Sequence, residues 1–157
     1  LTGLPNRRLL DDRLRMAVNQ GPRTGLHGAV LFIDLDRFKL INDTLGHHIG
    51  DGLLRIVSRR LTQCVRADDT VCRLGGEEFA IVIAAGPAVA LAIAERAQAA
   101  ISGTAEQPAI TVSIGVATGR GDQPEDFVRL LDIADGAMYR AKAHGAVHQC
   151  TSHRILH

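Results

Sequence analysis

Two aspartates follow a short, unbroken run of apolar residues. The run covers residues 29–33, and Asp34 and Asp36 come directly after it, with Leu35 between them. Residues two apart on a strand face the same side of a sheet, so both carboxylates share a face while Leu35 offers only its backbone carbonyl. Clustered carboxylates beside a free carbonyl oxygen suit a hard cation such as Mg²⁺. On its own, such a pair is more often a strand end and a helix cap.

A glycine-rich turn followed by two acids is the second motif, Gly-Gly-Glu-Glu-Phe at residues 75–79. Two adjacent glycines permit positive φ angles and leave backbone amides open to a phosphate group. An exposed hairpin tip would also look acidic. If this turn lies beside the strand that ends at Asp34, however, Glu77 completes a three-ligand oxygen site with Asp34 and the Leu35 carbonyl.

The segment at residues 38–51 carries the third set of polar residues. Asn42 can donate and accept hydrogen bonds and Asp51 can accept from two adjacent N–H groups, which is the pattern that the Watson–Crick edge of guanine requires. Lys39 can hold a phosphate as a point charge. The alternatives are helix caps for Asn42 and Asp51 and a solvated face for Lys39. The histidines at 47–48 suggest a metal site, but no cysteine or further histidine lies at zinc spacing.

Alternating helical and strand patterns position these motifs. Helical periodicity predicts helices, and short apolar or alternating runs predict strands. The expected helices cover residues 6–19, 50–66, 87–101 and 124–143, and the expected strands cover 29–34, 70–74, 79–83 and 110–117. The two middle strands form a hairpin whose tip is the Gly-Gly turn. This order predicts an α/β (α+β) fold with a mixed sheet.

Length and composition restrict the class of protein. The 157 residues fit one domain, and 46% apolar with 22% charged residues is an ordinary globular composition. A formal net charge of +1 and 3% aromatic residues argue against a nucleic-acid binder. Three cysteines without a CxxC pair predict a reducing compartment, which here means the cytoplasm.

Neither a membrane span nor a signal segment is evident in the sequence. The chain opens on Leu1 without an initiator methionine, so we expect residues 1–157 to be a single domain cut from a longer, multidomain protein. We expect no membrane contact by this domain, although its parent protein can still be membrane-anchored.

Five segments together resemble the GGDEF domain of diguanylate cyclases, in order and over nearly the whole chain. They cover residues 1–8, 32–51, 73–79, 111–117 and 134–142. The resemblance implies a nucleotidyl-cyclase palm, in which helices wrap a central mixed, mostly antiparallel sheet and a β-hairpin carries the Gly-Gly-Glu-Glu-Phe motif. It also implies the condensation of two GTP into cyclic di-GMP with release of two pyrophosphates, by an antiparallel homodimer.

The same resemblance assigns roles to individual residues. It implies two Mg²⁺ or Mn²⁺ ions per active site, with Asp34, the Leu35 carbonyl and Glu77 as ligands. It also implies that Glu77 and Glu78 are the catalytic residues and that Glu77 helps to deprotonate the attacking 3′-hydroxyl. The implied substrate-binding residues are Phe38, Lys39, Asn42, His47, Asp51, Gly75, Gly76 and Lys142.

An Arg-x-x-Asp pair at Arg66 and Asp69 resembles the inhibitory product-binding site of the family, with Arg73 as a further contributor. An arginine can fork onto a phosphate or guanine edge while the aspartate accepts from guanine N–H groups. The alternative is a helix C-terminus whose dipole Arg66 balances.

The sequence departs from the family pattern at Ala146, where an arginine that binds phosphate is expected. This departure favours the main rival reading, a catalytically weak or inactive domain that binds GTP or cyclic di-GMP and signals by conformation. The complete set of acids at 34, 77 and 78 argues against that reading. A cyclase that makes a mixed guanine–adenine dinucleotide is a third reading, but Asp51 suits the donors of guanine and would repel N1 of adenine.

Overall fold

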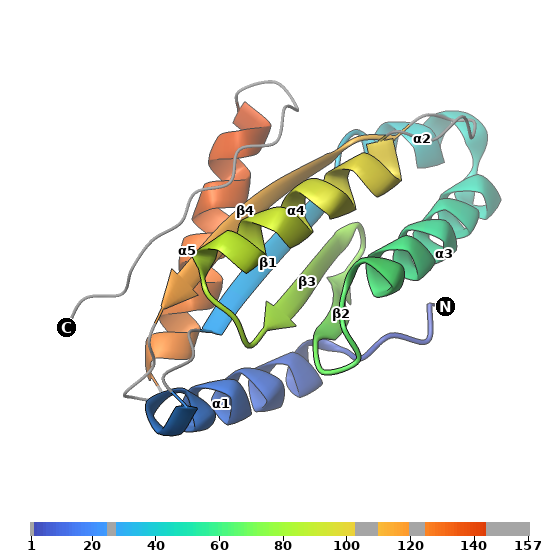
Figure 1. Ribbon diagram of the computed structural model, residues 1–157. Helices are drawn as coiled ribbons and strands as arrows, with labels where there is room; N and C mark the ends of the chain where they lie inside the picture. The colour runs from blue at the N-terminus through green and yellow to red at the C-terminus, as the bar shows by residue number, and fades with distance from the viewer. Residues whose placement is uncertain (1, 25–27, 103–109, 120–124, 144–157) are drawn as a thin grey trace.

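Four antiparallel strands form a sheet between two layers of helices (Figure 1). The computed structural model describes residues 2–24, 28–102, 110–119 and 125–143. In chain order, the elements of this part are α1 (Arg7–Thr24), β1 (Gly28–Leu35), α2 (Phe38–Leu45), α3 (His47–Cys64), β2 (Thr70–Gly75), β3 (Glu78–Ile83), α4 (Pro87–Ser102), β4 (Val112–Gly119) and α5 (Glu125–Ala143).

The strand order is β2-β3-β1-β4, and every neighbouring pair runs antiparallel. The α/β class, the four strands and the hairpin of β2 and β3 are therefore confirmed. The parallel pairing that a mixed sheet would contain does not occur among the described strands, because the inner strands β1 and β3 run opposite to both of their neighbours. None of the described helices is both long and apolar enough to cross a membrane.

Alternate residues of β1 belong to two separate hydrophobic cores. Leu31, Ile33 and Leu35 pack in the core under α3 and α4, whereas Val30 and Phe32 pack in the core under α1 and α5. This alternation is the ordinary period of a strand buried on both faces. It places Asp34, which continues the even-numbered series, on the α5 side of the sheet.

Helix α5 lies directly on the backbone of β4. A Cβ atom added to Gly115 would lie 2.1 Å from the carbonyl oxygen of Ala134 and 2.2 Å from the amide nitrogen of Met138. The glycine is therefore needed because helix and strand approach too closely for any side chain. This contact fixes α5 against the sheet and so fixes the residues at its C-terminal end.

Helix boundaries differ from the sequence prediction in three places. Helix α2 was not predicted, because its N-cap, Arg37, has φ 57° and makes no side-chain capping hydrogen bond, so the usual start signal is missing. Helix α3 begins at His47, directly after Gly46 at φ 91°. Helix α1 continues past the expected stop at residues 21–22 and ends at Thr24.

Candidate active site

Asp34 lies at the centre of the candidate site, one residue before the end of β1. It pairs with Glu78 of β3 on one side and Ser113 of β4 on the other. Its side chain is 9% exposed. One oxygen, Oδ2, accepts a hydrogen bond of 2.8 Å from Nζ of Lys142 on α5, while Oδ1 is buried and has no partner among the described residues. A buried carboxylate oxygen without a donor is costly, so this atom is suited to a bound cation.

The tip of the β2–β3 hairpin lies beside Asp34, which is the condition on which the expected three-ligand oxygen site depends. The amide of Leu35 donates a hydrogen bond of 3.2 Å to the carbonyl of Glu77. The turn itself needs positive φ angles, 152° at Gly75 and 47° at Gly76. No described atom lies within 4 Å of a Cβ built on either glycine, so the backbone of the turn is open to a ligand.

Arg73 holds the hairpin tip in place. Its Nε and Nη2 atoms donate hydrogen bonds of 3.2 and 3.0 Å to the carbonyl of Gly76. Its backbone amide donates to the carbonyl of Pro5 at 3.1 Å. The Arg73 side chain therefore stabilises the hairpin tip, and the structure does not bring it to the turn formed by Arg66 and Asp69.

Asp36 has a different role from Asp34, although the two side chains share a face. Its Oδ2 accepts a hydrogen bond from Oγ1 of Thr111, and its Oδ1 accepts one from Oγ of Ser113, both at 2.7 Å. Both oxygens are thus occupied by the β4 side of the sheet. Asp36 anchors the end of β1 to the start of β4, while Asp34 keeps a free oxygen. Thr111 and Ser113 were not singled out from the sequence, because only the folded register brings them to Asp36.

Mutual repulsion and burial shape the acidity of the site. Burial raises the pKa of Asp34, although the hydrogen bond and positive charge of Lys142 act in the opposite direction. Burial also raises the pKa values of Glu77 and Glu78, and the negative charge of Asp34 raises both further. Burial and the neighbouring negative charges thus disfavour the ionised forms of these carboxylates, and a divalent cation would stabilise those forms.

The donor set fits a hard cation only when the backbone contributes. Among the described residues, no three side chains of His, Cys, Asp or Glu come together as a metal site. Asp34 with its unpartnered oxygen, Glu77 and a backbone carbonyl are oxygen donors, which is the ligand type that Mg²⁺ and Mn²⁺ prefer. The donor chemistry of these residues is therefore compatible with such a cation.

A second cluster surrounds Asn42 where α2 meets α3. The side-chain Oδ1 of Asn42 is buried without a hydrogen-bond partner among the described residues. A Cβ on Gly50 would lie 1.8 Å from this oxygen and 3.2 Å from Cζ of Phe38. Gly50 therefore makes room for the Asn42 amide, a role that sequence reasoning missed and that a glycine inside a helix could have signalled. The half-buried Asp51 follows directly on α3.

The other residues expected to contact the nucleotide differ in how far they are exposed. Phe38 is only 4% exposed and belongs to the core under α3 and α4, and its ring borders the space at Gly50 that the Asn42 amide occupies. Lys39 and His47 are exposed on α2 and at the start of α3. Their contacts with a nucleotide stay predictions. Ala146 lies outside the described residues.

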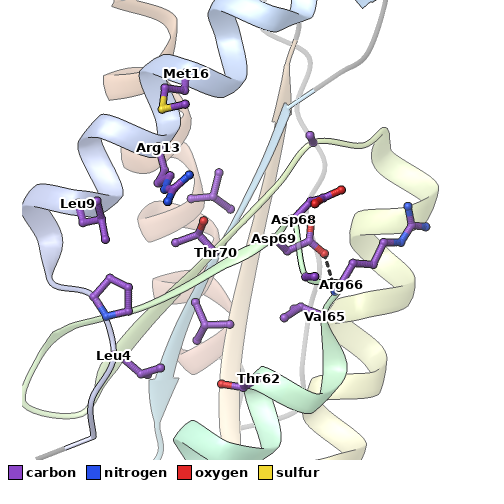
Figure 2. Close-up of a pocket in the computed structure, with 15 residues that line it drawn as sticks. Leu4, Leu9, Arg13, Met16, Thr62, Val65, Arg66, Asp68, Asp69 and Thr70 are labelled. Carbon is purple, nitrogen blue, oxygen red and sulfur yellow. Dashed lines mark hydrogen bonds between the residues drawn. The ribbon is translucent and has the colours of Figure 1, made fainter.

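Arg66 and Asp69 close a four-residue turn between α3 and β2, far along β2 from the Gly-Gly tip. The amide of Arg66 donates to Oδ2 of Asp69 at 3.0 Å, and the amide of Asp69 donates to the carbonyl of Arg66 at 3.1 Å. The Asp69 carboxylate thus orders the turn. Both residues line a pocket that also borders α1 (Figure 2).

Comparisons with known proteins agree with this geometry. A family model described as "Diguanylate cyclase, GGDEF domain" matches residues 1–148. The chain is 46% identical over 155 residues to the bifunctional diguanylate cyclase/cyclic di-GMP phosphodiesterase MucR of Pseudomonas aeruginosa, covering 96% of this chain and 22% of MucR. It is 44% identical to the response regulator PleD of Caulobacter vibrioides, covering 92% of this chain and 34% of PleD. The chain thus spans about a fifth to a third of these relatives.

Solved structures of similar domains share the fold over almost the whole chain. The GGDEF domain of YfiN (TpbB) from Pseudomonas aeruginosa superposes with a TM-score of 0.87 at 38% identity, covering 96% of this chain and 98% of that one. The GGDEF domain of DgcB from Caulobacter crescentus, solved in complex with c-di-GMP, gives a TM-score of 0.86 at 29% identity, covering 96% and 92%.

Proposed function

Because this chain belongs to the GGDEF family of diguanylate cyclase domains, we propose that it condenses two molecules of GTP into cyclic di-GMP and two pyrophosphates. In each half-reaction the 3′-oxygen of one GTP forms a bond to the α-phosphorus of the other. The bond from that phosphorus to the bridging oxygen of the leaving pyrophosphate breaks, and the 3′-hydroxyl proton is lost. Two such steps close the ring.

The observation that carries this proposal is the pairing of Asp34 with the hairpin tip. Asp34 sits opposite Glu78, and the backbone of Leu35 is hydrogen-bonded to that of Glu77. A buried, unpartnered carboxylate oxygen thus lies next to two glutamates and an open Gly-Gly turn. A purely structural strand end would have satisfied that oxygen, as the neighbouring Asp36 does.

Different residues of the site would bind the cations, accept the proton and contact the phosphates. Asp34, Glu77 and a backbone carbonyl at Leu35 would hold divalent cations, which lower the pKa of an attacking hydroxyl and neutralise phosphate charge. Glu77, whose pKa is raised by burial and by the charge of Asp34, would accept the 3′-hydroxyl proton. The amides of the Gly-Gly turn and the ammonium of Lys142 would face the phosphates.

Base selection would fall to Asn42 and Asp51. The buried Oδ1 of Asn42 has no hydrogen-bond donor among the described residues, and guanine supplies N–H donors on its Watson–Crick edge. Asp51 adds a second acceptor on the same helical junction. An adenine base would leave this carboxylate unpaired.

The proposed reaction requires two copies of the domain. Each site would hold one GTP, and each GTP must attack the other, so two domains would face each other as an antiparallel homodimer. We further propose that cyclic di-GMP binds at the Arg66–Asp69 turn and inhibits the reaction, which would place the product away from the hairpin tip. GTP as the substrate implies a cytoplasmic reaction.

A second candidate function is a non-catalytic receptor for cyclic di-GMP or GTP. The ordered Arg66–Asp69 turn on a pocket favours it, because a receptor needs that site and not the acids of the hairpin tip. One experiment separates the two functions: the concentrated domain is incubated with Mg²⁺ and GTP, and the products are identified by mass. Cyclic di-GMP and pyrophosphate in a 1:2 ratio support the cyclase, whereas unchanged GTP together with bound nucleotide supports the receptor.

A further inference from the structure

Asp36 attaches the end of β1 to β4 through three hydrogen bonds, although it contributes nothing to the unpartnered oxygen of the site. Its backbone amide donates to the carbonyl of Thr111 at 2.9 Å. Its carboxylate accepts hydrogen bonds of 2.7 Å from the hydroxyls of Thr111 and Ser113. The carboxylate is 7% exposed, and hydrogen bonds to a charged group are stronger than neutral ones. Asp36 is therefore held firmly in one position.

The position of Asp36 determines the direction of the Leu35 carbonyl. A trans peptide group is planar, and its N–H and C=O bonds point in opposite directions. Because the N–H of Asp36 points at the carbonyl of Thr111 on the β4 side, the Leu35 carbonyl in the same plane points to the β3 side of β1. The amide of Leu35 also points to that side, where it donates to the carbonyl of Glu77. The Leu35 carbonyl is thus directed towards the hairpin tip.

The residue after Asp36 has an unfavourable backbone conformation. Arg37 has φ 57°, and it is the one non-glycine residue with a positive φ angle in the part of the chain that the structure describes. Such a conformation is disfavoured by the Cβ atom and persists only where the surrounding structure holds it. The hydrogen bonds of Asp36 hold Arg37 on one side, and the bond of 3.2 Å from the amide of Ile41 to the Arg37 carbonyl holds it on the other. If Asp36 were released, this turn could relax and the Leu35 carbonyl could change direction.

We infer that Asp36 is a positioning residue, which directs the Leu35 carbonyl towards a divalent cation and binds neither the cation nor the nucleotide itself. The inference rests on the proposed function, because that function makes the Leu35 carbonyl a ligand of the cation. The hydroxyls of Thr111 and Ser113 belong to the same device, since they occupy both oxygens of the Asp36 carboxylate. Groups that orient a metal ligand affect metal affinity although they do not touch the metal.

Binding of Mn²⁺ without nucleotide, followed by electron paramagnetic resonance of the free ion, tests this role. Ser113→Ala and Thr111→Val each remove one hydroxyl donor and keep the charge of Asp36. Each should weaken Mn²⁺ binding about tenfold, the lower end for a group that orients a metal ligand. The matched control is Ser58→Ala, because Ser58 is also a buried serine, and its hydroxyl donates at 2.7 Å to the carbonyl of Leu54 within α3. This control should bind Mn²⁺ like the unmodified protein.

The dependence of cyclase activity on Mn²⁺ gives a second measurement, which a mere loss of stability would not change in this way. At limiting Mn²⁺ the Ser113→Ala protein should form cyclic di-GMP about tenfold more slowly than the unmodified protein, in line with its weaker cation binding. Saturating Mn²⁺ should restore most of that rate, because only the affinity for the cation is reduced. Thermal unfolding of each variant checks the fold. If Ser113→Ala does not fold, Thr111→Val carries the test, because Thr111 is exposed and belongs to neither core.

Three results would overturn the role of Asp36. The first is Mn²⁺ affinity that is unchanged or higher in Ser113→Ala and Thr111→Val, because a released carboxylate would then be a cation ligand itself or have no effect. The second is additive losses of affinity in Asp36→Ala and Ser113→Ala, because the hydroxyl would then act by another route. The third is failure of the unmodified protein to bind Mn²⁺. The cyclase proposal is decided separately, by the products that the unmodified protein forms from GTP and Mg²⁺.

Discussion

The ammonium of Lys142 lies 2.8 Å from Oδ2 of Asp34, joining the C-terminal end of α5 to the end of β1. The other oxygen of the same carboxylate has no partner among the described residues. Asp34 is thus half neutralised by a side chain of the protein and half available to a ligand. A cation that binds Asp34 must share this carboxylate with Lys142 or displace it.

Removing this ammonium should tighten cation binding. Without nucleotide, Lys142→Gln should bind Mn²⁺ about two- to fivefold more tightly, because a partly exposed ion pair contributes up to about 1 kcal/mol. Titration followed by electron paramagnetic resonance of free Mn²⁺ measures this affinity directly. Arg129→Gln removes one positive charge from an exposed position on the same helix and should change little. Weaker Mn²⁺ binding in Lys142→Gln would mean that the lysine supports the cation site instead of competing for it.

Glu77 should be required for catalysis and dispensable for folding. Glu77→Gln keeps the shape of the side chain and removes its charge, so cyclase activity should fall by at least about 100-fold. The melting temperature should stay close to that of the unmodified protein, because Glu77 lies in a turn outside both hydrophobic cores. Product formation is measured by mass spectrometry, with Glu95→Gln, an exposed acid on α4, as the control. A folded Glu77→Gln protein that retains its activity would contradict the assignment.

Gly50 should be essential for GTP binding although it touches no base. A methyl group in Gly50→Ala would occupy the place of the Asn42 Oδ1 atom, so the amide must leave its position. GTP affinity, measured by calorimetry, should fall about tenfold or more, the cost of a lost hydrogen bond that leaves a buried partner unpaired.

Gly52 supplies the matched control for that experiment. It lies in the same helix, and a Cβ built on it meets no described atom within 4 Å. Gly52→Ala should therefore bind GTP normally and gain up to about 1 kcal/mol in free energy of unfolding from helix propensity. In the double variant Asn42→Ala/Gly50→Ala, the second substitution should cost no further affinity, since its effect acts through Asn42. Additive losses would show that Gly50 acts by another route.

Asp51 should distinguish GTP from ATP. In the unmodified protein, ATP should compete poorly, because adenine leaves the carboxylate without donors at a cost of a few kcal/mol. The Asp51→Asn protein should bind GTP more weakly, and the difference between its affinities for GTP and ATP should be smaller than in the unmodified protein. Competition titrations give both ratios, and Asp43→Asn, an exposed aspartate on α2, is the control. If the unmodified protein binds both nucleotides equally, the base-reading role is wrong.

The sequence predicted most of the fold because the apolar periods of its strands and long helices are unambiguous. From the sequence, the closeness of Asp34 and the hairpin tip was only a condition for a metal site, and the register of β1 with β3 meets this condition. The residue pattern alone did not distinguish Asp34 from Asp36, and only the family resemblance singled out Asp34. The structural difference depends on Thr111 and Ser113, which reach Asp36 only through the register of β1 with β4.

Helix α2 and the role of Gly50 were missed for related reasons. Helix α2 starts without a side-chain cap, after an arginine in a left-handed conformation, so the sequence lacks the usual signal for the start of a helix there. The space that Gly50 leaves for Asn42 exists only once α2 folds back on α3. Placing Arg73 also required the structure, because its hydrogen bonds to the hairpin tip follow from the turn conformation at Gly76.

The contact of Gly115 with the backbone of α5 means that the number of residues between this contact and Lys142 determines where the lysine lies. Because the carbonyl of Ala134 and the amide of Met138 lie where a Cβ of residue 115 would be, the backbone of α5 packs directly against β4 at this point. Deleting one residue between Met138 and Lys142 would turn the lysine by about 100° around the helix axis and draw it back by about 1.5 Å. The ammonium would then leave Asp34 while every side chain of the active site remained in the sequence.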